Sequence, residues 1–286
     1  MIYISSACSK QILIGPAVKE LVDQGFRNIE LTGGTEYYDG CESELLELKK
    51  GYNLNFLVHN YFPPPKDPFI LNLASLNTDI YEASLNHLKK ALRMTRLFGG
   101  KQFGFHAGFF IDRPVDEIGR KFGKSNLYDK EKALENFIDA FHILKNEFHD
   151  INLYIENNCY SESNYMVYGN NAPFMLLTFH DFTELRKRID FTLLMDIGHL
   201  MVSANTFHLD FKKEFQDMFE ASDYIHISNN DRRHDQNIGL TDQSKLFRIL
   251  NNYQWKNKTV TLEIYDGFKA LNNTYEIVSA LKWENE

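Results

Sequence analysis

The sequence has 286 residues, of which 31 are basic and 39 acidic, and its net charge of −8 counts against a polyanionic partner. Its 43% hydrophobic and 24% charged residues are typical of a globular protein, and no uninterrupted apolar stretch is long enough for a membrane span. The three cysteines form no CxxC pair, and the first residues lack the basic start of a signal peptide. We therefore expect a reduced, cytoplasmic setting.

Taken in chain order, short apolar segments alternate with longer segments of helical period. The predicted strands are 2–5, 28–32, 55–60, 102–107, 152–157, 192–197, 224–228 and 259–264. The helices predicted to follow them are 14–24, 42–50, 78–98, 129–148, 174–188, 210–221, 242–253 and 272–283. Eight βα units with no linker between them predict an α/β fold, a single (β/α)8 TIM barrel over residues 1–286.

A doubly wound open sheet is the alternative architecture. Such a fold would place a glycine-rich phosphate-binding turn after the first strand, and the segment SSACSKQ (5–11) is not one. The longest predicted loops, 61–77, 108–128 and 158–173, each follow a strand. In a barrel these loops lie at the C-terminal mouth, where active sites are built. Their aromatic side chains either wall a binding pocket or cover the top of the barrel.

Seven consecutive predicted strands carry a side chain that can bind a metal near their C-terminal ends. These are Glu30, His59, His106, Glu156, Asp196 with His199 three residues later, His226 and Glu263. One such residue alone is more simply a hydrogen-bonded core group, and Glu30, in mid-strand, either orients a ligand or is a salt-bridged core acid. Carboxylates gathered at one mouth repel each other unless a cation neutralises them, so the pattern predicts a metal site there.

The types of ligand restrict the metal without choosing it. Mixed Asp, Glu and His side chains exclude a soft thiolate site and admit Mn²⁺, Zn²⁺, Co²⁺, Fe²⁺ or Mg²⁺. Asp196 with His199 would place one ligand on a strand and the other on the turn that follows it.

The order of these residues resembles the xylose-isomerase-like TIM-barrel superfamily over the whole chain. DIGH (196–199), YIENN (154–158) and HISNND (226–231) resemble its D-[TI]-[GC]-H, L-E-N and H-x-x-D/N-x elements. The superfamily contains metal-dependent sugar and sugar-phosphate isomerases and epimerases. It also contains endonuclease IV, the zinc-dependent AP endonuclease of family 2.

The isomerase branch implies one metal held by Glu156, Asp196, His226 and Glu263. Glu156 and Glu263 would also be catalytic, one removing the α-proton of the substrate and the other returning it, through an enediolate held by the metal. The substrate would be a small sugar or sugar phosphate, oriented by His199 and by Arg232 or Arg233. No membrane partner is expected, and assembly into a homo-oligomer stays open.

The endonuclease branch implies three zinc ions and a phosphodiesterase that acts on abasic DNA. Its additional ligands would be His59, His106, His199, Asp231 and His234. RRHDQNIG (232–239) is similar to that branch's D-R-H-x-x-I-G, and LNLAS (71–75) resembles its I-N-L-A-S. Arg232, however, stands where the family has an aspartate, and HAGFF (106–110) replaces H-P-G-S. We therefore predict an isomerase or epimerase, with the endonuclease as the alternative. A binding barrel without chemistry would be expected to lose some ligands, and this chain retains the full set.

Overall fold

The computed structural model describes residues 1–113, 117 and 122–283. Its strands are β1 (Ile2–Ser5), β2 (Asn28–Leu31), β3 (Asn55–His59), β4 (Gln102–His106), β5 (Asn152–Glu156), β6 (Thr192–Asp196), β7 (Ser222–Ile227) and β8 (Thr259–Leu262). They pair in parallel and in chain order, and β8 pairs with β1 to close the barrel. Each strand overlaps the segment predicted for it, so the α/β class and the (β/α)8 barrel are confirmed.

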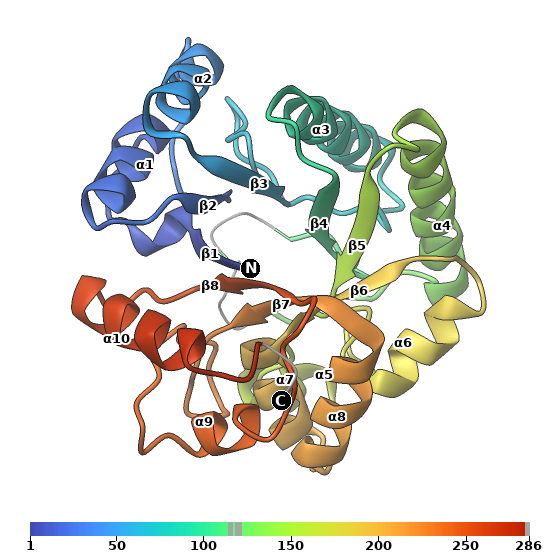
Figure 1. Cartoon of the computed structure of the whole chain (residues 1–286). Coiled ribbons are helices and arrows are strands. Elements are labelled where there is room, and N and C mark those ends of the chain that lie inside the picture. The colour runs from blue at the N-terminus through green and yellow to red at the C-terminus, as the bar shows by residue number, and fades with distance from the viewer. Residues whose placement is uncertain (114–116, 118–121, 284–286) are drawn as a thin grey trace.

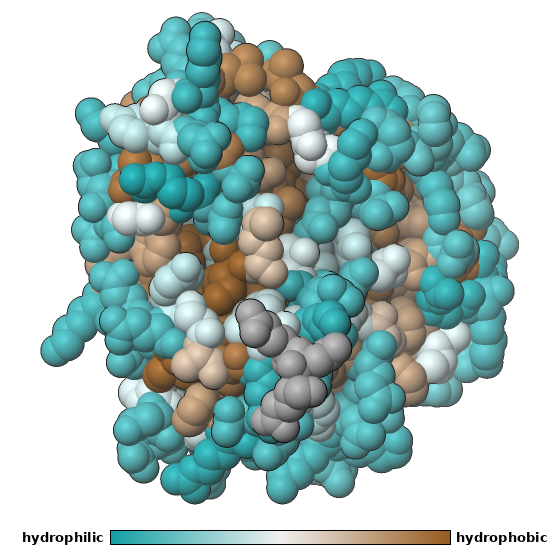
Figure 2. All heavy atoms as spheres, viewed as in Figure 1, coloured by the Kyte–Doolittle hydropathy of each residue, from teal (hydrophilic) through white to brown (hydrophobic). Residues whose placement is uncertain are grey.

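Helices form an outer ring around the strands, as Figure 1 shows. They are α1 (Ile14–Asp23), α2 (Cys41–Tyr52), α3 (Thr78–Leu97), α4 (Lys130–Glu147), α5 (Glu162–Tyr168), α6 (Phe179–Arg186), α7 (Ile197–Thr206), α8 (Phe211–Ala221), α9 (Lys245–Leu250) and α10 (Phe268–Ser279), with a 3-10 turn η1 (Ser6–Cys8) after β1. The space-filling view shows hydrophilic residues over most of this ring and hydrophobic residues nearer its centre (Figure 2).

Two helices lie where none is predicted. The helix α5 lies within the predicted loop 158–173, and α7 begins directly after β6. Nearly every residue of α7 is buried, so its sequence lacks the apolar–polar alternation by which a surface helix is recognised. The helix α6 also begins later than predicted, because Thr178 and Asp181 form a capping box that starts it at Phe179.

The alternation of side chains along each strand fixes what lies inside the barrel. Tyr3, Leu57, Tyr154, Leu194 and Tyr224 form an apolar cluster of their own. Since side chains two residues apart on a strand share a face, the next residues on that face lie one layer nearer the mouth. Those residues include His59, Glu156, Asp196 and His226. An apolar layer thus lies beneath the acids and histidines.

The residues between these positions face outward and join the main core. Ile155, Met195 and Ile225 belong to the cluster that packs the strands against the helices. Among the described residues, no helix is long and apolar enough to cross a membrane. Part of the predicted mouth loop 108–128, namely 114–116 and 118–121, lies outside the described residues.

Candidate metal centre

The four residues predicted to hold one metal come together at the mouth end of β5 to β8. The Nδ1 atom of His226 lies 3.7 Å from Glu156 Oε1 and 4.0 Å from Asp196 Oδ2. It lies 3.7 Å from Oε2 of Glu263, the first residue after β8. Two neighbouring ligand atoms that each lie about 2.0–2.6 Å from a shared cation are themselves about 3–4 Å apart. The arrangement therefore fits a divalent cation.

A buried atom without a partner supports the same fit. His226 is fully buried, and among the described residues its Nδ1 has no hydrogen-bond partner. A buried polar atom left unpaired costs about 1–3 kcal/mol. The three buried carboxylates around it also repel one another. A divalent cation bound between them would remove both penalties.

The pKa values of the three acids reflect their burial next to one another with no cation between them. Burial and the neighbouring carboxylates raise the pKa of Asp196 to about 6. The same causes raise the pKa of Glu263 to about 7. Burial also opposes ionisation of Glu156, but the histidines around it hold its pKa below the usual range. Binding a cation would favour the ionised form of all three acids.

Glu30 on β2 contacts the far side of the imidazole of His226. Its Oε1 lies 3.1 Å from His226 Nε2, and its Oε2 accepts a hydrogen bond of 2.9 Å from Thr261 Oγ1. A carboxylate that holds one ring nitrogen keeps the other aimed at the metal position. Among the described residues neither Glu30 Oε1 nor His226 Nε2 makes a well-aligned hydrogen bond, so the contact is an ion pair. Because its partner is the predicted ligand His226, Glu30 is placed to orient that ligand.

We therefore expect Glu30→Gln to weaken divalent metal binding by about 10- to 100-fold, because the carboxylate that orients the ligand histidine is lost. Titration calorimetry with Mn²⁺ and Zn²⁺ measures the effect. Glu20→Gln is the matched control, since Glu20 accepts a hydrogen bond from the hydroxyl group of Ser9 and takes no part in the centre. Equal metal affinity for Glu30→Gln and Glu20→Gln would contradict the orienting role.

Three further histidines surround the carboxylate of Glu156. His59 Nε2 lies 2.7 Å and His106 Nδ1 3.4 Å from its Oε2, while His199 Nδ1 lies 3.5 Å from its Oε1. Among the described residues, three groups have ligand atoms within 4.8 Å of one another: His59, Glu156 and His226; His106, Glu156 and His199; and Glu30, His226 and Glu263. Asp196 belongs to none of these groups. The structure thus brings all three of these predicted additional ligands to the centre.

His199 lies in the first turn of α7, which directly follows β6. Asp196 caps this helix by accepting a hydrogen bond of 2.6 Å from the backbone N–H of His199. The ring Nδ1 lies 2.9 Å from the carbonyl oxygen of Asn157, so it donates there. The Nε2 atom faces Asp235 Oδ2 at 3.3 Å. Sequence reasoning missed Asp235, whose one signal is its place beside His234.

The remaining predicted residues lie away from the cluster. His234 Nδ1 contacts Asp231 Oδ2 at 2.8 Å, and both side chains are exposed. The guanidinium of Arg232 packs over an aromatic ring of α8, and Arg233 Nε lies 3.8 Å from a carboxylate of α5. The structure therefore does not bring Asp231 or His234 to the ligand cluster, although His234 lines the cavity described next. Arg232 and Arg233 do not line the cavity described next.

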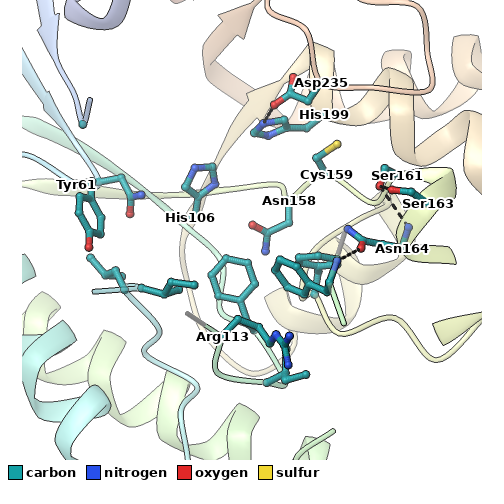
Figure 3. A pocket seen from close by; sticks show the side chains of 18 of the residues that line it. Tyr61, His106, Arg113, Asn158, Cys159, Ser161, Ser163, Asn164, His199 and Asp235 are labelled. Carbon is teal, nitrogen blue, oxygen red and sulfur yellow. Dashed lines mark hydrogen bonds and ion pairs between the residues drawn. The ribbon is translucent and has the colours of Figure 1, made fainter. Parts of the chain in front are cut away.

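A cavity of about 670 Å³ adjoins the centre. Among the residues that line it are His106 and His199, which both contact Glu156. In Figure 3, His199 and Asp235 lie on one side of the cavity and Arg113 on the opposite side. A cavity of this size is typical of a site for a small organic molecule.

Comparisons with known proteins agree with this architecture. The family model described as the xylose isomerase-like TIM barrel matches residues 18–283. The structure is similar to that of a D-tagatose 3-epimerase-like protein, at 15% sequence identity and a TM-score of 0.71, covering 97% of this chain and 95% of that one. A comparison with the curated proteins finds no match.

Two further solved structures are similar to this chain. The 3-keto-D-glucoside 4-epimerase of E. coli is 14% identical, with a TM-score of 0.62 and 97% of each chain covered. A family 2 AP endonuclease of Brucella melitensis is 13% identical, with a TM-score of 0.65, covering 98% of this chain and 99% of that one. Because the family model spans nearly the whole chain, this protein belongs to the xylose isomerase-like TIM-barrel family.

Proposed function

We propose that this protein is a divalent-metal-dependent sugar isomerase or epimerase that moves a proton between carbons of a small sugar. One observation carries the proposal. Glu156 on β5 and Glu263 after β8 each lie 3.7 Å from His226 Nδ1, and they approach it from different strands. Of two carboxylates that flank one position, one can remove a proton from a substrate carbon. The other can return a proton to the opposite face of that carbon or to the neighbouring carbon.

Glu156, Asp196, His226 and Glu263 would hold the metal, of which Mn²⁺, Zn²⁺, Co²⁺ and Mg²⁺ are the candidates. When bound, it would supply a Lewis acid that polarises the substrate carbonyl. The structures to which this chain is similar include proteins named as sugar epimerases, which agrees with the proposal.

The side chains that line the cavity would orient the sugar. His106 and His199 both line the cavity and both contact Glu156, so a sugar in the cavity would lie against these two rings. Arg113 lines the cavity, while Arg232 and Arg233 do not. Its guanidinium is paired with Glu117, so its charge is compensated. This pairing favours an unphosphorylated sugar over a sugar phosphate.

Solvent isotope exchange tests the proposal directly. Protein loaded with Mn²⁺ is incubated in D₂O with a panel of pentuloses and hexuloses, and deuterium at the carbons next to the carbonyl is measured by NMR. We expect incorporation into at least one ketose, its loss on chelation, and one bound ion per chain by elemental analysis. No incorporation into any ketose of the panel, free or phosphorylated, would contradict the proposal.

A second candidate, a multi-metal phosphodiesterase, has one observation in its favour. His106, Glu156 and His199 offer ligand atoms that all lie within 4.8 Å of one another, which is an arrangement that could hold a further ion. Three zinc ions per chain and chelator-sensitive nicking of abasic DNA would support it. We prefer the isomerase because, among the described residues, the cavity lining contains a single Lys or Arg side chain and the net charge of the chain is −8, whereas DNA binding needs phosphate neutralisation.

A further inference from the structure

The cavity is larger than a single sugar needs. A hexose has twelve non-hydrogen atoms, and even at water's share of about 30 Å³ each it would fill roughly 360 Å³. The cavity volume is about 670 Å³. Close to half of the space is therefore left for another part of the ligand.

The additional space has an aromatic wall. The apolar side chains that line the cavity are Ile70, Leu71, Phe109, Ile111, Phe122 and Phe174. The ring centroid of Phe174 lies 5.7 Å from that of Phe109 and 5.2 Å from that of Phe122. The fully buried Tyr160 packs against Phe174 from behind, with centroids 5.7 Å apart. We call Phe109, Phe122 and Phe174 the aromatic subsite.

The polar side chains beside the aromatic subsite each make a hydrogen bond within the protein. The hydroxyl groups of Ser161 and Ser163 lie 2.9 Å apart. Asn164 Oδ1 accepts a hydrogen bond of 2.7 Å from the backbone N–H of Phe122. Arg113 pairs with Glu117 and donates to a serine hydroxyl. A second sugar here would bury hydroxyl groups with few partners, which costs free energy, whereas an apolar ring would not.

We propose that the substrate is a sugar that carries a flat aromatic substituent, with the sugar beside His106 and His199 and the substituent against the aromatic subsite. The inference rests on the proposed function for the sugar half of the site. The sugar half and the aromatic half lie on opposite sides of the same cavity. Figure 3 shows Arg113 across the cavity from His199, and the guanidinium of Arg113 lies 6.0 Å from the ring centroid of Phe122. Burial of a phenyl ring against aromatic side chains would strengthen binding by about tenfold or more.

Phenyl β-D-glucopyranoside and methyl β-D-glucopyranoside are the probes, and calorimetry on the metal-loaded and the chelated protein gives their affinities. We expect the phenyl compound to bind at least about tenfold more tightly in both forms, because the aromatic subsite does not involve the metal. Phe109→Ala, at a half-buried position, should reduce this preference to a few-fold. Phe174→Leu should also reduce the preference for the phenyl compound, and it replaces Phe109→Ala in the experiment if that variant fails to fold.

Phe179→Ala is the matched control, because Phe179 is half-buried on α6 and packs against Phe182 outside the cavity. It should keep the full preference for the phenyl compound. Equal affinity for the two probes, or no measurable binding of the phenyl compound, would overturn the inference. Failure of the proposed function would give a different result. The protein would still prefer the phenyl compound, and Phe109→Ala would still reduce that preference, but no ketose would incorporate deuterium.

Discussion

Glu156→Gln and Glu263→Gln are each expected to lower solvent deuterium incorporation into a bound ketose by about 100- to 10,000-fold, the usual contribution of a proton-transfer group. Glutamine keeps one oxygen in place of the carboxylate but cannot accept the proton. Both side chains are almost fully buried, so solvent cannot readily take over their role. NMR of the exchanged ketose gives the rate, and elemental analysis of each variant shows whether metal is still bound.

His59→Ala and His106→Ala separate the two candidate functions. In a one-metal isomerase these histidines contact Glu156 from outside the set of four ligands, so we expect losses of only about tenfold. In a multi-metal phosphodiesterase each substitution would empty a metal position, and cleavage of abasic DNA would fall by orders of magnitude.

Full exchange activity in Glu156→Gln and Glu263→Gln would refute the catalytic assignment of the two glutamates.

Chelation is expected to lower the melting temperature by about 8–16 °C. An ion that binds only the native state at a thousand times its dissociation constant adds about 4 kcal/mol, and each kcal/mol shifts Tm by about 2–4 °C in a chain of this size. Its loss also leaves Glu156, Asp196 and Glu263 facing one another around His226. Differential scanning calorimetry before and after chelation, and after readdition of Mn²⁺ or Zn²⁺, measures the shift.

Asp196→Asn provides a sharp comparison within this experiment. Asparagine is as good an N-cap as aspartate, so α7 should still begin at Ile197. The variant therefore loses the charge that the metal needs and keeps the helix. We expect a smaller thermal shift on chelation than in the parent, and a chelated form at least as stable as the chelated parent. An unchanged Tm on chelation of the parent would mean that these acids are neutralised in another way.

The sequence by itself determined the barrel and most of the centre. Eight apolar segments alternate with helical ones, and the acids and histidines lie at the ends of the apolar segments. Since parallel strands in a barrel all end at the same mouth, the placement of Glu156, Asp196 and His226 at strand ends was enough to bring them together. The two-residue period of a strand then fixes which side chains point inward.

The tertiary structure alone decided which residues of the segment after β7 reach the site. Asp231 Oδ1 accepts hydrogen bonds of 2.8 Å from the backbone N–H groups of Arg233 and His234, and Arg232 has a left-handed φ of 68°. This turn leaves His234 paired with Asp231 at the edge of the cavity, away from the ligand cluster, and lets Asp235 face His199. In a strand the direction of a side chain follows from its position. In a turn it follows from backbone angles that depend on the residues packed around it, so spacing in the sequence favoured His234 over Asp235.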